Sequence, residues 1–106
     1  MGTTKRATPT TSDDASGMKL PDDIAADLQR RLRRVEGQMR GLQSMIDEGR
    51  DCRQIVTQVS AALHALEQVG FRIVASGLTY CIERPEEAAA AGYSVDDVQR
   101  MFMRLA

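Results

Sequence analysis

Two long segments with apolar residues at helical spacing dominate this 106-residue chain and restrict it to an all-α fold. In the first segment, apolar residues recur every three or four positions and occupy only about 80° of a helical projection. They are Ile24, Leu28, Leu32, Val35, Met39, Leu42 and Ile46. Pro21 and Asp22 suit a helix N-terminus, and Gly49 suits a helix end. We therefore predict a helix over residues 22–48.

The second segment extends from about residue 51 to residue 83, and Pro85 then prevents the helix from continuing. Its apolar stripe consists of Ile55, Val56, Val59, Leu63, Leu66, Ile73 and Val74. Gly70 and Gly77 lie on the same stripe, where the absence of a side chain permits another element to approach closely. A long second helix with one apolar face follows from this pattern.

A third, short helix is predicted near the C-terminus. Ser94 and Asp97 have the spacing of a capping box, in which each side chain bonds the backbone N–H of the other residue. The apolar residues that follow at helical spacing are Val95, Val98, Phe102 and Leu105. The sequence thus predicts three helices and no strand.

Helices of about 27 and 33 residues are long for a chain of this size. Paired as an antiparallel hairpin, they leave apolar surface on more than one side, and a short third helix cannot cover it. Burial of that surface therefore requires self-association. We expect an antiparallel four-helix bundle in which two chains contribute two helices each.

The two cysteines of the chain, Cys52 and Cys81, both fall within the second helix and are 81 − 52 = 29 residues apart. They lie about 20° apart around the helix and about 43 Å apart along it. A disulfide needs Cα atoms within roughly 4.4–6.8 Å, so the two thiols cannot meet within one chain. In an antiparallel dimer, Cys52 of one chain comes close to Cys81 of the other. Alternatively, both cysteines are small buried apolar residues.

Composition separates a tail from the helical domain. Residues 1–20 are rich in threonine and poor in apolar residues, so we expect a disordered tail there and a helical domain over residues 21–106. No stretch is long and apolar enough for a membrane span, and the N-terminus does not look like a secretion signal. We therefore expect a cytoplasmic protein with reduced thiols and no membrane partner.

The formal net charge of −1 conceals a local concentration of arginine. Five arginines lie within eleven residues that contain a single acid, Glu36, and they project away from the apolar seam of the first helix. They are Arg30, Arg31, Arg33, Arg34 and Arg40. Guanidinium groups bind phosphates, so this face suits the backbone of double-stranded DNA. The alternative is an ordinary solvated helix surface.

An enzymatic function is not expected. The sequence has no glycine-rich phosphate loop and no paired carboxylates suited to acid–base chemistry. The one histidine, His64, projects about 120° away from Cys52, so it is not placed to activate that thiol or to complete a metal site with it. We predict neither a catalytic site nor a bound cofactor.

Several stretches resemble the copper-sensing repressor family (CsoR/RcnR-like). They are residues 31–41 (RLRRVEGQMRG), Ile46, Asp51 with Cys52, and residues 56–61 (VTQVSA). The resemblance covers about residues 22–84. It implies an all-helical, disc-shaped homotetramer, built as a dimer of dimers, that binds operator DNA through the arginines. It also implies that the repressor releases DNA when an inducer reaches the cysteines.

One departure from the copper-sensing pattern concerns the inducer. Copper sensors of this family carry a histidine four residues before the second cysteine, where this chain has Gly77. Two cysteines without that histidine look like the persulfide-sensing branch (CstR-like). That resemblance implies that persulfide or polysulfide, as a small reactive sulfur species, crosslinks Cys52 to Cys81 of the partner subunit.

Two alternatives stay open. In the first, the same two thiolates, from Cys52 and Cys81, bind Cu(I), a soft ion for which thiolates are good ligands. In the second, the chain is a helical oligomer that acts only through protein partners. Arg50 and Arg53 favour a thiolate at Cys52 whereas Asp51 opposes it, so the sequence leaves open which cysteine attacks first.

Overall fold

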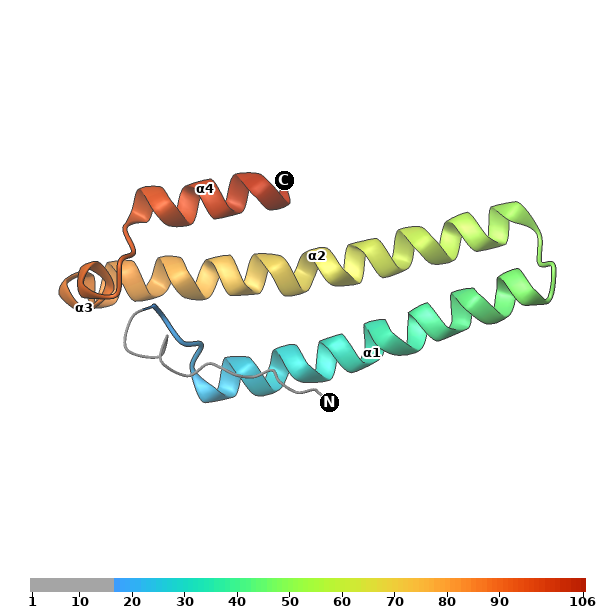
Figure 1. Cartoon of the computed structure of the whole chain (residues 1–106), viewed down its shortest axis with the longest axis horizontal. Coiled ribbons are helices and arrows are strands. Elements are labelled where there is room, and N and C mark those ends of the chain that lie inside the picture. The colour runs from blue at the N-terminus through green and yellow to red at the C-terminus, as the bar shows by residue number, and fades with distance from the viewer. Residues whose placement is uncertain (1–16) are drawn as a thin grey trace, which may run out of the picture. The chain divides into compact units, whose positions relative to one another are not determined.

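The computed structural model describes residues 17–106, and these residues form four helices and no strand. In chain order the helices are α1 (Asp22–Asp47), α2 (Cys52–Glu83), α3 (Pro85–Ala90) and α4 (Val95–Leu105), as Figure 1 shows. The all-α prediction is confirmed, and both ends of the two long helices agree with the predicted bounds to within one residue. The predicted disordered tail falls outside the described residues over positions 1–16, and residues 17–20 form no helix.

The prediction of three helices was wrong, because the short helix α3 was missed. Pro85 ends α2 and also occupies the first turn of α3, where a helix needs no backbone N–H from proline. Glu86 and Glu87 place negative charge in the first turn, where the helix dipole favours it, and alanines continue the helix. A helix of 6 residues is too short to show an apolar period.

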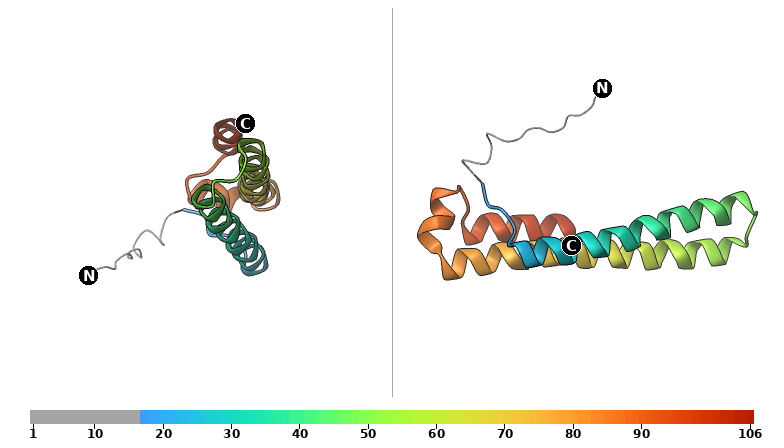
Figure 2. Two further views of the ribbon diagram at one scale, coloured as in Figure 1. Left: turned by 90° about the vertical axis from the view of Figure 1, so that its right-hand side faces the viewer. Right: turned by 90° about the horizontal axis from the view of Figure 1, so that it is seen from below.

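The described chain forms two compact units, of which the first contains Pro21–Ile73 together with Leu105. We call it the hairpin unit. In it, α1 runs antiparallel beside α2, as Figures 1 and 2 both show. The side chains that it buries include Leu28 and Val35 of α1 and Ala62 and Val69 of α2. These four residues mark the line along which the two helices pack.

The turn between α1 and α2 depends on Gly49, which has φ +70°. This left-handed conformation costs glycine little because glycine has no Cβ. The N–H of Gly49 donates to the carbonyl of Ile46 at 3.1 Å, and the N–H of Arg50 donates to that of Met45 at 3.0 Å. These two bonds satisfy the last carbonyls of α1 and reverse the chain. Asp51 then accepts a hydrogen bond from the backbone N–H of Arg53 at 3.0 Å, at the start of α2.

The second unit, which we call the C-terminal unit, includes residues 74–104. Its core consists of Cys81, Ala88 and Val98. The partly buried residues that pack against this core are Val74, Tyr80, Tyr93 and Met101. Gly77 is buried beside it, since a Cβ at that position would lie 3.6 Å from Val98 Cγ2 and 3.5 Å from Met18 Cε.

Within the hairpin unit, Gly70 is approached even more closely. A Cβ there would lie 2.8 Å from Leu105 Cδ1, so a side chain at this position would displace Leu105. The prediction that Gly70 and Gly77 permit close approach is therefore confirmed. None of the helices in residues 17–106 is long and apolar enough to cross a membrane.

The capping box of α4 gives a test of the fold. The hydroxyl of Ser94 accepts a hydrogen bond from the N–H of Asp97 at 3.1 Å, and the carboxylate of Asp97 accepts one from the N–H of Ser94 at 3.0 Å. We expect Ser94→Ala to lower the free energy of unfolding by about 1 kcal/mol, because an N–H of the first turn loses its partner. Urea denaturation followed by circular dichroism measures this change.

The matched control is Ser44→Ala, at an exposed serine inside α1. A serine to alanine change at a surface site without a capping role alters stability by no more than about 0.5 kcal/mol. Equal effects of the two substitutions would show that the α4 cap does not contribute as described.

Candidate functional site

Cys52 is exposed and is the first residue of α2. It lines a shallow, open depression together with Arg53, Val56 and Thr57. The neighbouring Arg50 bonds with Gln54 at 3.1 Å and with Glu48 at 3.4 Å. Cys52 is therefore a free thiol that small molecules can reach in the described chain.

Cys81 has the opposite environment. Only 6% of its surface is exposed, and it lies in the core of the C-terminal unit with Ala88 and Val98. Because α2 is a single helix of 32 residues from Cys52 to Glu83, the two cysteines stand about 43 Å apart along its axis. The structure thus agrees with the prediction that the thiols cannot meet within one chain.

The apolar stripe of α2 is only partly covered in the hairpin unit. On a helical projection with Cys52 at zero, the buried Ala62 and Val69 lie at about −80° and −100°, so α1 packs to one side of the cysteine. The stripe centred on Cys52 stays exposed. Its exposed members in this unit are Val56, Val59, Leu63, Leu66 and Ile73.

The same side of the hairpin carries exposed apolar residues from α1. They are Leu32, Met39 and Ile46, which project toward the side of α1 that continues the stripe of α2. We call these three residues and the five exposed α2 residues the apolar flank. Val56 and Leu63 are each 59% exposed and Ile46 is 62% exposed. Contiguous exposed apolar residues of this kind are typical of an interface.

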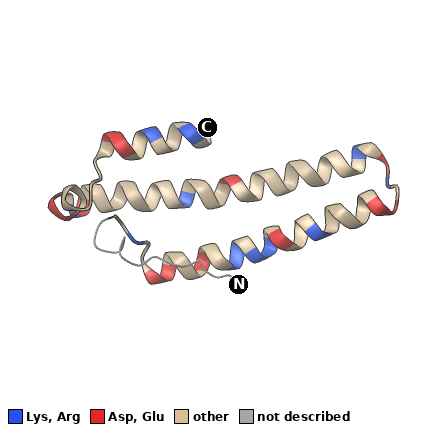
Figure 3. Cartoon of the chain, in the orientation of Figure 1, with Lys and Arg blue, Asp and Glu red and all other residues tan. Residues whose placement is uncertain are grey.

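The predicted arginines lie elsewhere on the hairpin unit, and Figure 3 shows basic residues clustered on α1. Within residues 17–106, Arg33, Arg34 and Arg40 make no ion pair, whereas Arg30 and Arg31 bind Asp27 at 3.1 and 2.9 Å. The structure therefore divides the five predicted arginines into three unpaired cations and two paired ones.

One basic residue was missed by the sequence analysis. Arg72 of α2 lies 3.7 Å from the carboxylate of Asp27, so it joins the arginines of α1. Arg72 is the only Lys or Arg between Arg53 and Arg84, and it projects about 160° away from Cys52. A lone basic residue on the side of α2 opposite the apolar stripe was the sequence feature from which its place in the basic surface could have been predicted. We call Arg72 and the five predicted arginines the basic surface.

Metal ligands are sparse within one chain. No group of three or more His, Cys, Asp or Glu side chains is placed to hold a metal ion in the part of the chain that the structure describes. The side chain of His64 is 77% exposed, and its Nδ1 lies 3.6 Å from Glu67 Oε1. His64 is thus exposed, and on α2 it projects about 120° away from Cys52. Within residues 17–106, Cys52 and Cys81 therefore share no metal site in one chain.

Comparisons with known proteins show to which protein family the chain belongs. A family model described as metal-sensitive transcriptional repressor matches residues 25–104. The chain is 44% identical over 55 residues to the copper-sensing transcriptional repressor RicR of Mycobacterium tuberculosis, an alignment that covers 52% of this chain and 57% of RicR. It is 27% identical over 74 residues to the copper-sensing transcriptional repressor CsoR of Bacillus subtilis, covering 70% and 73% of the two chains.

Two solved structures are similar. The copper-sensing repressor CsoR with Cu(I) from Geobacillus thermodenitrificans matches with a TM-score of 0.69 and 27% identity, covering 84% of this chain and 95% of that one. The nickel-responsive transcriptional regulator InrS matches with a TM-score of 0.65 and 28% identity, covering 76% and 91%. The fold of the described residues is similar to that of these transcriptional regulators. The chain belongs to the metal-sensitive transcriptional repressor family, whose members are repressors rather than enzymes.

The different burial of the thiols gives a test of the site. We expect N-ethylmaleimide to modify Cys52 at least about tenfold faster than Cys81, because reaction requires access to the sulfur. Mass spectrometry of samples quenched over time measures the two rates by peptide. Cys52→Ser and Cys81→Ser variants assign each phase to its residue. Equal rates, or faster modification of Cys81, would contradict the described environments.

Proposed function

We propose that this chain is a repressor that binds operator DNA through its basic surface and senses its inducer with Cys52 and Cys81 of the partner subunit. The observation that carries the proposal is the placement of Cys52. It is an exposed thiol at the N-terminal end of an exposed apolar stripe, while unpaired arginines lie elsewhere on the same hairpin unit. The hairpin unit therefore presents a thiol, an apolar surface and a cationic surface.

A second copy of the chain is the proposed occupant of the apolar flank. Exposed Val56, Leu63 and Leu66 need burial, and burying each such side chain contributes about 1.5–3 kcal/mol. An antiparallel partner extends this packing along α2 and brings Cys52 toward Cys81 of the partner subunit. The proposed assembly is a homotetramer formed as a dimer of dimers.

Persulfide or polysulfide is the proposed inducer, since Gly77 replaces the histidine that copper sensors of this family carry. The Cys52 thiolate attacks the outer sulfur of a persulfide RSSH, forms Cys52–S–SH and releases RS⁻. The thiolate of Cys81 of the partner subunit then attacks the inner sulfur of this adduct. A disulfide forms between the subunits and HS⁻ leaves, so two thiols are oxidised while the transferred sulfur is reduced.

The structure supports Cys52 as the first site of attack in this sequence of steps. Cys52 is exposed, whereas Cys81 is covered by Ala88 and Val98 of its own chain. The second step therefore requires a shift of α3 and α4 away from Cys81. Such a shift links inducer chemistry to a change in the arrangement of helices, which lowers DNA affinity in the proposal.

Cu(I) is the second candidate inducer, and the relatives favour it. RicR and two CsoR proteins among the matches are named as copper-sensing. Two thiolates suit Cu(I), and Cys52 with Cys81 of the partner subunit would supply them. The copper-sensing pattern of the family adds a histidine to the two cysteines. Because this chain has Gly77 at that position, only two thiolates remain to bind Cu(I).

The inducer is tested by DNA release. A fluorescent duplex of the promoter upstream of the gene for this chain is titrated with the protein before and after polysulfide treatment. We expect affinity to fall about 5–150-fold, the usual range of allosteric coupling, in the wild type and to stay unchanged in Cys52→Ser and Cys81→Ser. Stoichiometric anaerobic Cu(I) binding with the same loss of affinity, and no response to polysulfide, would favour the copper alternative instead.

DNA binding by the unpaired arginines is tested by its salt dependence. Each phosphate contact contributes about 0.9 to the slope of log K against log salt concentration. We expect Arg34→Gln and Arg40→Gln each to weaken binding and to reduce this slope by about that amount, because neither residue is neutralised by an acid in residues 17–106. Fluorescence anisotropy over a series of salt concentrations measures the slope.

The matched control is Arg84→Gln, which removes one charge from an arginine of the C-terminal unit that pairs with Glu87 at 3.2 Å. We expect this variant to keep the wild-type slope. Wild-type protein that binds no duplex, or binds it without dependence on salt, would favour the second alternative, in which the oligomer acts only through protein partners.

A further inference from the structure

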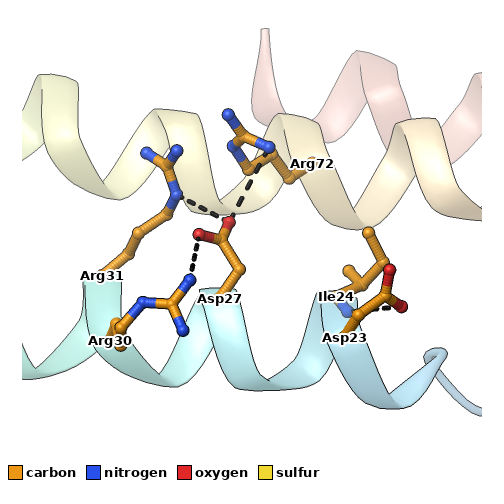
Figure 4. Close-up of polar contacts among 6 residues, drawn as sticks. All are labelled: Asp23, Ile24, Asp27, Arg30, Arg31 and Arg72. Carbon is orange, nitrogen blue, oxygen red and sulfur yellow. Dashed lines mark hydrogen bonds and ion pairs between the residues drawn. The ribbon is translucent and has the colours of Figure 1, made fainter.

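A single carboxylate organises half of the basic surface. Asp27 accepts a hydrogen bond from Nε of Arg31 at 2.9 Å and one from Nη2 of Arg30 at 3.1 Å. Its Oδ2 also lies 3.7 Å from Nη1 of Arg72. Figure 4 shows the three guanidinium groups arranged around this carboxylate. Three cations therefore converge on one anion.

The contacts of Asp27 join two helices. Asp27, Arg30 and Arg31 belong to α1, whereas Arg72 belongs to α2, and all four residues lie in the hairpin unit. Asp27 and Arg31 are 28% and 31% exposed, so the pair lies at the edge of the helix interface, while Arg72 is 47% exposed. The ion pair thus links the guanidinium of Arg72 to the arginines of α1 through Asp27.

The cluster keeps an excess of positive charge. Three guanidiniums against one carboxylate leave a charge of about +2, and each guanidinium has five N–H donors. Asp27 contacts one nitrogen of each arginine, so donors stay available on all three. The hydrogen bond from Arg31 holds the pKa of the Asp27 carboxyl below its usual range, so this acid is ionised at neutral pH.

We propose that Arg72 binds a backbone phosphate of the operator and that Asp27 is the positioning residue that holds Arg31 and Arg72 at a fixed spacing across α1 and α2. The ligand is the phosphodiester backbone of double-stranded DNA, for which an arginine fork is well suited. This inference rests on the proposed DNA-binding function and adds a residue from α2 to it. A rigid pair of guanidiniums on two helices matches phosphates of fixed spacing better than flexible side chains do.

A purely structural role is the competing explanation, because the Asp27–Arg72 ion pair also connects α1 with α2. The two roles differ in what they change. Loss of an inter-helix ion pair alters stability but leaves the salt slope of DNA binding unchanged. Loss of a phosphate contact lowers the slope at every DNA sequence.

The test uses the full chain and two duplexes of equal length, one with the upstream promoter and one of random sequence. Arg72→Gln keeps most of the side-chain stem and removes the charge, whereas Arg72→Lys keeps the charge. We expect Arg72→Gln to reduce the slope of log K against log salt concentration by about 0.9 on both duplexes, and Arg72→Lys to retain the wild-type slope. Arg84→Gln is the charge-matched control and should also retain it.

Asp27→Asn tests the positioning role. This substitution removes one negative charge, so the affinity for the random duplex should rise. The affinity for the promoter duplex should then exceed that for the random duplex by a smaller factor than in the wild type. We expect the ratio of the two affinities to fall about tenfold, comparable to the loss of one well-placed contact. Circular dichroism confirms that each variant is folded. If Arg72→Gln is unfolded, Arg72→Lys still tests the phosphate contact, because a salt slope below that of the wild type in this charged variant would contradict it.

The outcomes separate the two levels of the proposal. If the wild type binds DNA with a steep salt dependence and Arg72→Gln keeps that slope, Arg72 makes no phosphate contact and this inference is wrong, although the DNA-binding function stands. An unchanged affinity ratio in Asp27→Asn overturns the positioning role. If the wild type binds neither duplex, the proposed function itself fails and the inference fails with it.

Discussion

The continuity of α2 is the constraint on which the proposed function of this chain depends. A helix that runs without interruption from Cys52 to Glu83 fixes the separation of its two cysteines at about 43 Å. No rearrangement of side chains can bring these thiols together in one chain. Any joint chemistry of Cys52 and Cys81 must therefore use two chains, and the exposed apolar flank offers a surface on which a second chain can pack.

Packing of α1 against one side of α2 gives the hairpin unit two different surfaces. Burial of Ala62 and Val69 leaves the stripe around Cys52 exposed, while the opposite side carries Arg72 next to Asp27. In the proposed repressor, association uses the first surface and DNA uses the second together with the arginines of α1. Both surfaces share α2, so in the proposed repressor a change in how partner helices pack around Cys52 is passed to the arginines through α2 itself.

The sequence predicted the features that depend on neighbouring residues along the chain. Gly49, Pro85 and the Ser94–Asp97 capping box defined helix ends that the structure confirms. It failed for α3, because six residues carry no apolar period. The sequence also could not show which part of the α2 stripe is covered by α1. Nor could it show that Arg72 reaches Asp27, which is 72 − 27 = 45 positions away. Both features follow from packing between helices. Family membership was confirmed, while the identity of the inducer is a matter of proposal.

The meeting of the two thiols between chains is tested most directly by isotope mixing. Protein of natural isotope content and ¹⁵N-labelled protein are unfolded together, refolded, oxidised with a mild thiol oxidant and digested, and the linked peptides are identified by mass spectrometry. Proximity of Cys52 to Cys81 of the partner subunit predicts Cys52–Cys81 peptide pairs, about half of which combine one light and one heavy peptide. Links only between identical cysteines, or no links at all in an assembled oligomer, would contradict it.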